Sequence, residues 1–232
     1  MANHVTAEQI RYELDQTTKT LPIYEQMPSL FTNRKMFDSY RRFEDEGFRL
    51  ALHAEHKMMA GSHKSARGYL FKKYNNDKDG AEQIRNYMRR IEGARLLRRF
   101  IDDRGFTRVT VPGKWLYELP SDFPERYLLV VEKLDLLEIA ATARAYHRIG
   151  KDQTRELATV LYYFRGLNST AENLPYTEDG KIAFVDTERW SNNKDYLRRV
   201  GERMPIDRRD LAQDVYDQLR RAKERPFSSQ FK

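Results

Sequence analysis

The chain has 232 residues, and 40% of them are hydrophobic, which is enough apolar material for the core of one large domain or of a two-lobed unit. Its net charge of +7 favours anionic partners such as nucleotides, nucleic acid or acidic proteins, although its 42 basic and 35 acidic residues are interspersed, as on an ordinary solvated surface. There is no cysteine, which excludes disulfides, thiolate metal sites and a cysteine nucleophile.

Neither a membrane span nor a classical secretion signal is predicted. No apolar run approaches the ~18 residues that cross a bilayer. The first residues also lack the basic-then-apolar order of a signal peptide. We therefore expect a cytoplasmic protein, with a secreted effector that lacks a classical signal as the alternative.

The first part of the chain, residues 6–50, is predicted to be helical and polar. Thr6 is followed three residues later by Gln9, which is the pattern of a capping box. Ile10 and Leu14 then repeat at helical spacing. Further apolar residues indicate one or two more amphipathic helices in this stretch.

Two strands and a long helix are predicted next. Residues 48–53 and 68–74 have the composition of strands, and residues 60–68 form a turn-rich basic stretch. The helix predicted at 81–103 has an apolar stripe for burial. This stripe comprises Ile84, Met88, Ile91, Leu96 and Phe100.

The second half alternates between short strands and helices. Strands are predicted at 107–111, 115–119, 127–131 and 181–185, with a turn at 178–180, and helices at 136–148, 152–166 and 195–224. This order of helices, strands, one helix, strands and helices predicts an α+β fold.

A lysine and a glutamate are placed where they could form an ion pair beside a phosphate. Lys72 lies on the second predicted strand, and Glu92 follows twenty residues later in the long helix. A strand lysine held by a helix glutamate can present its ammonium group to phosphate oxygens. Lys73 is the rival, because successive strand residues face opposite sides of a sheet.

Asn173 and Asp186 bracket a predicted hairpin that turns at 178–180. A tight hairpin brings its two ends together in space. Amide and carboxylate oxygens are hard ligands of the kind that Mg²⁺ prefers. The pattern therefore predicts a magnesium site, and an ordinary surface hairpin is the alternative.

The apolar strand at 127–131 leads into residues 132–134 and then a helix. Exposed backbone after a buried strand is a place where a flat nucleotide base could form hydrogen bonds.

Taken together, these features resemble the protein-kinase superfamily over residues 48–225. Lys72 and Glu92 are similar to the paired lysine and glutamate of that family, Val131 to its gatekeeper, and Glu132 to Leu134 to its hinge. Asn173 and Asp186 match its two metal-binding residues at the family's spacing.

The resemblance implies a two-lobed protein-kinase-like fold. Residues 48–134 would form a small antiparallel-sheet N-lobe and residues 135–232 a reduced helical C-lobe, with residues 1–47 as an N-terminal helical extension. It also implies ATP and Mg²⁺ as cofactors. Lys72, Val131, Glu132 and Leu134 would then contact the nucleotide, and Asn173 and Asp186 would hold the metal.

Among the departures from the family pattern, two concern the phosphate loop and the catalytic aspartate. The glycine-rich phosphate loop is missing, and the stretch around Gly61 and Gly68 would take its place. The catalytic aspartate lies five residues before the metal-binding asparagine in the family, and Asn168 occupies that position here. Asparagine can orient a hydroxyl group but cannot accept its proton.

The sequence therefore predicts an ATP- and Mg²⁺-binding kinase-like protein that transfers phosphate to a hydroxyl group of a protein or small molecule, with Asn168, Lys72 and Glu92 as catalytic residues. One alternative is a pseudokinase with a binding or scaffolding role. The other is a basic nucleic-acid-binding protein without a nucleotide pocket.

Overall fold

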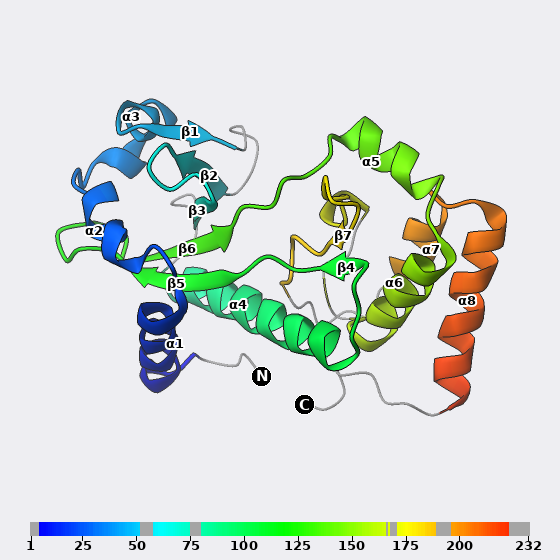
Figure 1. Ribbon diagram of the computed structural model, residues 1–232. Helices are drawn as coiled ribbons and strands as arrows, with labels where there is room; N and C mark the ends of the chain where they lie inside the picture. Colours follow the sequence, from blue (N-terminus) through cyan, green and yellow to red (C-terminus); the bar gives the residue numbers. More distant parts are fainter. Residues whose placement is uncertain are drawn as a thin grey trace. The chain divides into compact units, whose positions relative to one another are not determined.

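A computed structural model describes residues 5–51, 58–74, 80–165, 167, 171–188 and 196–222 (Figure 1). The chain divides into two compact units. Unit 1 comprises Met1–Ile91 and Gly113–Lys133, and unit 2 comprises Glu92–Pro112 and Leu134–Lys232.

Unit 1 contains a five-stranded sheet and the helices that cover it. Its helices are α1 (Ala7–Thr20), η1 (Tyr24–Gln26), α2 (Met27–Leu30), η2 (Met36–Asp38), α3 (Tyr40–Asp45) and the first part of α4 (Gly80–Asp103). Its strands are β1 (Phe48–Leu50), β2 (Met58–His63), β3 (Tyr69–Tyr74), β5 (Lys114–Glu118) and β6 (Tyr127–Glu132).

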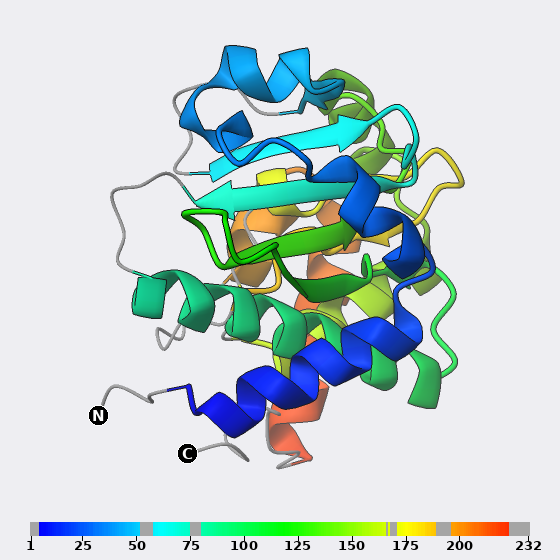
Figure 2. The same ribbon diagram turned by 90° about the vertical axis from the view of Figure 1, so that its left-hand side faces the viewer.

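All neighbouring strands of this sheet are antiparallel, in the order β1-β2-β3-β6-β5. Figure 2 shows the strands side by side, with α1 and α4 along the sheet. In the register, Lys72 lies between Ala60 of β2 and Leu129 of β6. Directly paired residues share a face, so these three side chains point to the same side of the sheet.

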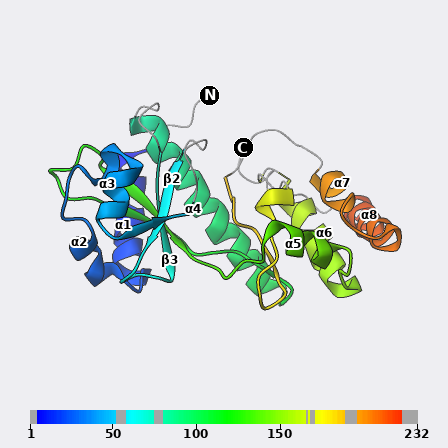
Figure 3. The same ribbon diagram turned by 90° about the horizontal axis from the view of Figure 1, so that it is seen from above.

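Each face of the sheet has its own apolar core. One face is covered by the segment from Leu21 to Phe43, whose aromatic rings pack on Phe71 and Tyr117. The other face is covered by α4, through a cluster that includes Ile84, Tyr87, Ile91, Leu129 and Val131. Figure 3 shows α2 and α3 on one side of β2 and β3, and α4 on the other.

The predicted capping box at the N-terminus is confirmed. Thr6 Oγ1 accepts the backbone N–H of Gln9 at 3.1 Å, and Gln9 Oε1 accepts the backbone N–H of Thr6 at 2.8 Å. Ile10 and Leu14 of α1 pack against the same apolar cluster as α4. The helix predicted after Thr6 is therefore confirmed as α1.

Two predictions for unit 1 need correction. Residues 60–68 were expected to form a turn, but β2 extends through His63, because its backbone pairs with β1 and β3. The first predicted strand, 48–53, is β1 only as far as Leu50, and residues 52 and 53 lie outside the described part of the chain.

The apolar stripe of α4 also differs from the predicted one. Met88 and Leu96 are half-buried, because the helix rotates about 100° per residue and the contact line drifts across its surface. The buried apolar residues of α4 are Ile84, Tyr87, Ile91, Ala94, Leu97, Phe100 and Ile101.

Unit 2 is mainly helical and has one apolar core. Its elements are the second part of α4, β4 (Val109–Thr110), α5 (Ile139–Tyr146), α6 (Lys151–Tyr163), η3 (Ala171–Asn173), β7 (Ile182–Ala183), α7 (Tyr196–Gly201) and α8 (Ile206–Arg221). The helix predicted at 195–224 is two helices, because the chain turns after α7 and α8 begins only at Ile206, with Pro205 as its N-cap residue.

Helices α6 and α8 lie side by side and run in the same direction. Near their N-terminal ends, the Nε of Arg208 donates a hydrogen bond to the carbonyl of Ile149 at 3.1 Å. Near their C-terminal ends, the hydroxyl of Tyr162 donates to the carbonyl of Leu219 at 3.3 Å. These two helices form the scaffold on which the shorter elements pack.

The α+β class is confirmed, with an antiparallel sheet in unit 1 and mostly helices in unit 2. Among the described residues, no helix is long and apolar enough to cross a bilayer.

Candidate metal and nucleotide site

The segment from Asn173 to Asp186 is a backbone hairpin within unit 2. The N–H groups of Val185 and Ala183 donate to the carbonyls of Asn173 and Pro175, at 3.2 and 2.8 Å. The two ends of the hairpin are therefore neighbours along the backbone, as predicted. Metal binding by the two side chains stays a prediction.

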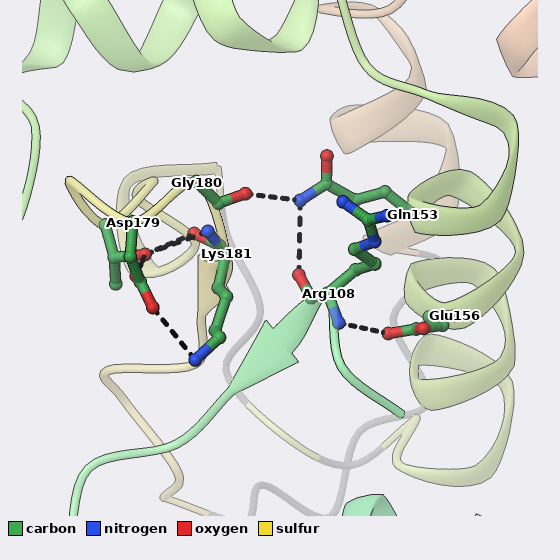
Figure 4. Close-up of polar contacts among 7 residues, drawn as sticks. Arg108, Gln153, Glu156, Asp179, Gly180 and Lys181 are labelled. Atoms are coloured by element: carbon green, nitrogen blue, oxygen red, sulfur yellow. Dashed lines mark hydrogen bonds and ion pairs between the residues drawn. The ribbon is translucent and has the colours of Figure 1, made fainter. Parts of the chain in front are cut away.

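The tip of the hairpin has the turn residues that its backbone requires. Gly180 has φ +82°, a left-handed conformation that glycine adopts without strain. The Thr177 hydroxyl accepts the N–H of Lys181 at 2.9 Å and donates to Asp179. The Lys181 ammonium lies 2.8 Å from Asp179 (Figure 4). Hydrogen bonds from Lys181 and Thr177 hold the pKa of Asp179 below its ordinary value.

Helix α6 holds the other side of the hairpin through the Gln153 side chain. Its Nε2 donates to the carbonyl of Arg108 at 3.1 Å and to that of Gly180 at 2.9 Å (Figure 4). Its Oε1 accepts the hydroxyl of Tyr176 at 3.1 Å. One buried amide thus links α6, the segment before β4, and the first arm and tip of the hairpin.

The Glu156 carboxylate, one turn further along α6, binds the start of β4. It accepts the backbone N–H groups of Thr107 and Arg108, at 3.2 and 2.7 Å. Strand β4 pairs in parallel with β7, so this carboxylate also fixes the strand that precedes Asp186.

Replacing Gln153 with leucine is expected to lower the free energy of unfolding of unit 2 by about 1–3 kcal/mol, because two carbonyls and one hydroxyl lose a buried partner. Urea unfolding followed by circular dichroism would measure it. Gln213→Leu is the matched control: Gln213 is an exposed residue of α8, so this change should alter the free energy of unfolding only slightly. Equal stability of the two variants would contradict the linking role of Gln153.

The two predicted metal ligands are both half-buried. Asp186 Oδ1 accepts the backbone N–H of Glu188 at 3.1 Å, which fixes the orientation of the carboxylate. Amide and carboxylate oxygens fit the donor preference of Mg²⁺, which keeps several positions for water and phosphate oxygens. The described residues contain no cluster of three or more acidic or histidine side chains suited to a metal ion.

The two neighbouring lysines of β3 face opposite sides of the sheet. Lys72 lies on the side that α4 covers, because its register partners Ala60 and Leu129 face that way. Lys73 lies on the other side, where it is fully buried and forms an ion pair with Glu125 beside the ring of Phe37. Lys72 is thus the lysine that faces α4, and Lys73 has a structural partner.

Glu92 is an exposed residue of α4 and belongs to unit 2, whereas Lys72 is a half-buried residue of unit 1. Their ion pair stays a prediction. Asn168 lies outside the described residues, so its position at the predicted catalytic loop also stays a prediction.

The predicted hinge uses most of its backbone donors within unit 1. The N–H groups of Glu132 and Lys133 donate to the carbonyls of Gly113 and Gly68, each at 2.8 Å. The Glu132 carboxylate accepts the N–H of Gly113 at 2.7 Å. The N–H groups of two of the three hinge residues therefore have partners in unit 1, and a hydrogen bond from the hinge to a base stays a prediction. Val131 is buried on the α4 face of the sheet.

Gly61 does not lie in a loop, contrary to the sequence expectation for the phosphate-binding stretch. It lies within β2, where a β-carbon would overlap the ring of Phe43 and would be 2.9 Å from the carbonyl of Arg49. A packing role explains this glycine. Its missing side chain points to the face opposite Lys72, whereas Gly68 lies in the turn before β3.

Gln153 and Glu125 were missed by sequence reasoning. Gln153 lies four residues before Leu157, on the apolar side of α6. A polar residue at such a core position requires hydrogen-bond partners, and this was the signal that the sequence offered for Gln153. Glu125 carried no such signal, since it lies in the loop between β5 and β6.

The sequence matches no protein-family model and no curated protein sequence. Solved structures that match include WbdD, at 12% identity and a TM-score of 0.36, with 75% of this chain and 45% of that chain covered. They also include the MAP kinase LmaMPK10 from Leishmania major, at 11% identity and a TM-score of 0.36, with 78% and 65% covered. The chain spans less than two thirds of the length of either protein.

Proposed function

We propose that this chain binds Mg-ATP and transfers phosphate to a hydroxyl group of a protein or a small molecule. The observation that supports this proposal best is the hairpin of unit 2. Its backbone hydrogen bond between Val185 and Asn173 brings the two ends of the hairpin together, and Asn173 and Asp186 at these ends have the order and spacing of the kinase metal ligands.

The proposed roles follow from the chemistry of each group. The Asp186 carboxylate and the Asn173 amide oxygen would hold Mg²⁺, which neutralises phosphate charge when bound. The Lys72 ammonium would contact phosphate oxygens. Asn168 could orient the acceptor hydroxyl but could not take its proton. Phosphoryl transfer depends mainly on positioning and charge stabilisation, so the missing base slows the reaction without excluding it.

A pseudokinase is the second candidate, and Asn168 is the observation that favours it. In that case the same residues would bind Mg-ATP, and the bound nucleotide would stabilise a binding or scaffolding surface with little turnover. Transfer of label from γ-labelled ATP to protein or small-molecule hydroxyls separates the two. Incorporation above that of a Lys72→Met variant supports the kinase.

Thermal unfolding with and without Mg-ATP tests nucleotide binding itself. At 100 times the dissociation constant, a ligand that binds only the folded state adds about 2.7 kcal/mol. We expect Asp186→Asn to lose this Mg²⁺-dependent stabilisation, because it removes the charge but keeps an acceptor for the Glu188 N–H. Asp179→Asn, at the tip of the same hairpin, is the matched control and should keep it.

Two results would contradict the proposal. If the parent protein gains no stability from Mg-ATP, the nucleotide-binding function is wrong, and the basic nucleic-acid-binding alternative becomes the one to test. If Asp186→Asn responds to Mg-ATP as the parent does, the metal assignment is wrong.

A further inference from the structure

Gly93 lies in the middle of α4, at a position where a side chain could not fit. A β-carbon built on it would overlap the backbone carbonyl oxygen of Thr187 and would lie 3.3 Å from the Thr187 Cβ. Glycine is a poor helix former in a helix interior. Its presence here is explained by the direct contact between the helix backbone and Thr187, and both residues belong to unit 2.

Thr187 directly follows Asp186, and its side chain is fully buried. On the other side of Asp186, the N–H of Phe184 donates to the carbonyl of Thr110 at 2.9 Å, and that of Val185 donates to Asn173 at 3.2 Å. The carboxylate therefore lies between two fixed points. One is the strand pairing before it, and the other is the contact with α4 after it.

Helix α4 is also connected to the strand pairing that precedes Asp186. Helix α4 ends at Asp103 and the chain continues into β4, which pairs with β7. The Nη2 of Arg98 in α4 donates to the carbonyl of Val111, just after β4, at 3.1 Å. Both sides of Asp186 are thus tied to α4, and a shift of this helix would move the carboxylate.

We infer that Gly93 is a positioning residue for Asp186: by its lack of a side chain it lets Thr187 pack on α4 and so fixes the orientation of the Asp186 carboxylate. This inference rests on the proposed function, in which that carboxylate holds Mg²⁺. It adds that the metal-binding geometry depends on the position of α4, the helix that also carries Glu92.

The test compares Gly93→Ala with Gly80→Ala. Gly80 begins the same helix and has nothing within 4 Å of a built β-carbon, so the pair isolates the contact with Thr187. In a Mg²⁺ titration at fixed ATP, we expect Gly93→Ala to weaken the apparent Mg²⁺ affinity by about 10- to 100-fold, the range for residues that orient a metal ligand. Gly80→Ala should match the parent.

Hydrogen exchange without nucleotide gives a readout that does not depend on ligand binding. The amides of Val185 and Glu188, which donate to Asn173 and to the Asp186 carboxylate, should exchange faster in Gly93→Ala than in Gly80→Ala. A folded Gly93→Ala protein with parent-like Mg²⁺ affinity and parent-like exchange would overturn the inference.

Two further variants keep the result interpretable. If Gly93→Ala does not fold, Thr187→Gly replaces it, because it loosens the same contact without a clash; lower Mg²⁺ affinity then supports the inference, and unchanged affinity overturns it. Asp186→Asn separates the two hypotheses. If it leaves Mg-ATP binding unchanged, the metal assignment in the proposed function is wrong, whereas loss in Asp186→Asn without loss at position 93 refutes only the role of Gly93.

Discussion

Replacing Phe31 with alanine is expected to lower the free energy of unfolding of unit 1 by about 3–5 kcal/mol, the usual cost of deleting a buried aromatic ring. Phe31 is only 2% exposed. Its ring lies 5.7–6.2 Å, between centroids, from the rings of Phe37, Phe48, Phe71 and Tyr117. It therefore joins the segment before β1 to strands β1, β3 and β5.

Urea unfolding of the parent and variant would measure this loss, with Tyr12→Ala as the control. Tyr12 is an aromatic residue of the same N-terminal stretch, but it is 53% exposed, so its removal should change stability by less than about 1 kcal/mol. Similar losses for the two variants would show that Phe31 is not a central core residue.

The position of Phe31 also has a consequence for residues 1–47. The sequence sets them apart as a helical extension, but apolar side chains between Leu21 and Phe43 cover one face of the sheet, and Ile10 and Leu14 pack on the other. Most domains gain about 5–15 kcal/mol in all from folding. A chain that begins at Phe48 would expose this face, and we expect it to aggregate rather than to fold.

Local signals predicted much of the fold. The capping box of Thr6 and Gln9, the turn glycine at position 180 and the apolar strand β6 depend on neighbouring residues, and all three are present. Strand β2 was missed because its sequence, Met58 to His63, has small and polar residues in place of the usual β-branched ones. Its pairing with β1 and β3 decides its conformation.

In the candidate site, too, local signals predicted the backbone of the hairpin but not the contacts between distant segments. The adjacency of Asn173 and the strand end at Val185 followed from a hairpin that the turn residues predict. The contacts of Gln153 with residues 108 and 180, and that of Gly93 with Thr187, join segments far apart in the chain. Only packing brings these partners together, so no local pattern could indicate them. Because side chains alternate along a strand, the sequence predicted that Lys72 and Lys73 lie on opposite faces of the sheet. It did not predict which of these faces α4 covers.

Replacing Lys73 with methionine is expected to destabilise unit 1 by about 3–5 kcal/mol, the cost of breaking a buried ion pair by removing one partner. The side chains of Lys73 and Glu125 are 3% and 11% exposed. The Oε2 of Glu125 is buried without a hydrogen bond among the described residues. Without the lysine, this largely buried carboxylate would lose the ion pair that offsets its desolvation.

Lys72→Met is the matched control, because it makes the same change one residue earlier on the opposite face. Its side chain is half-buried, so we expect a smaller loss of stability together with a loss of Mg-ATP stabilisation. The double variant Lys73→Met with Glu125→Leu should recover most of the stability that Lys73→Met loses, since apolar replacements of a buried pair are often neutral.

If Lys73→Met is as stable as the parent, or if the double variant is no more stable than the single one, the ion pair is not what holds the β5–β6 loop against β3. If Lys73→Met instead abolishes nucleotide binding in a stable protein while Lys72→Met keeps it, the phosphate-binding lysine has been assigned to the wrong face of the sheet.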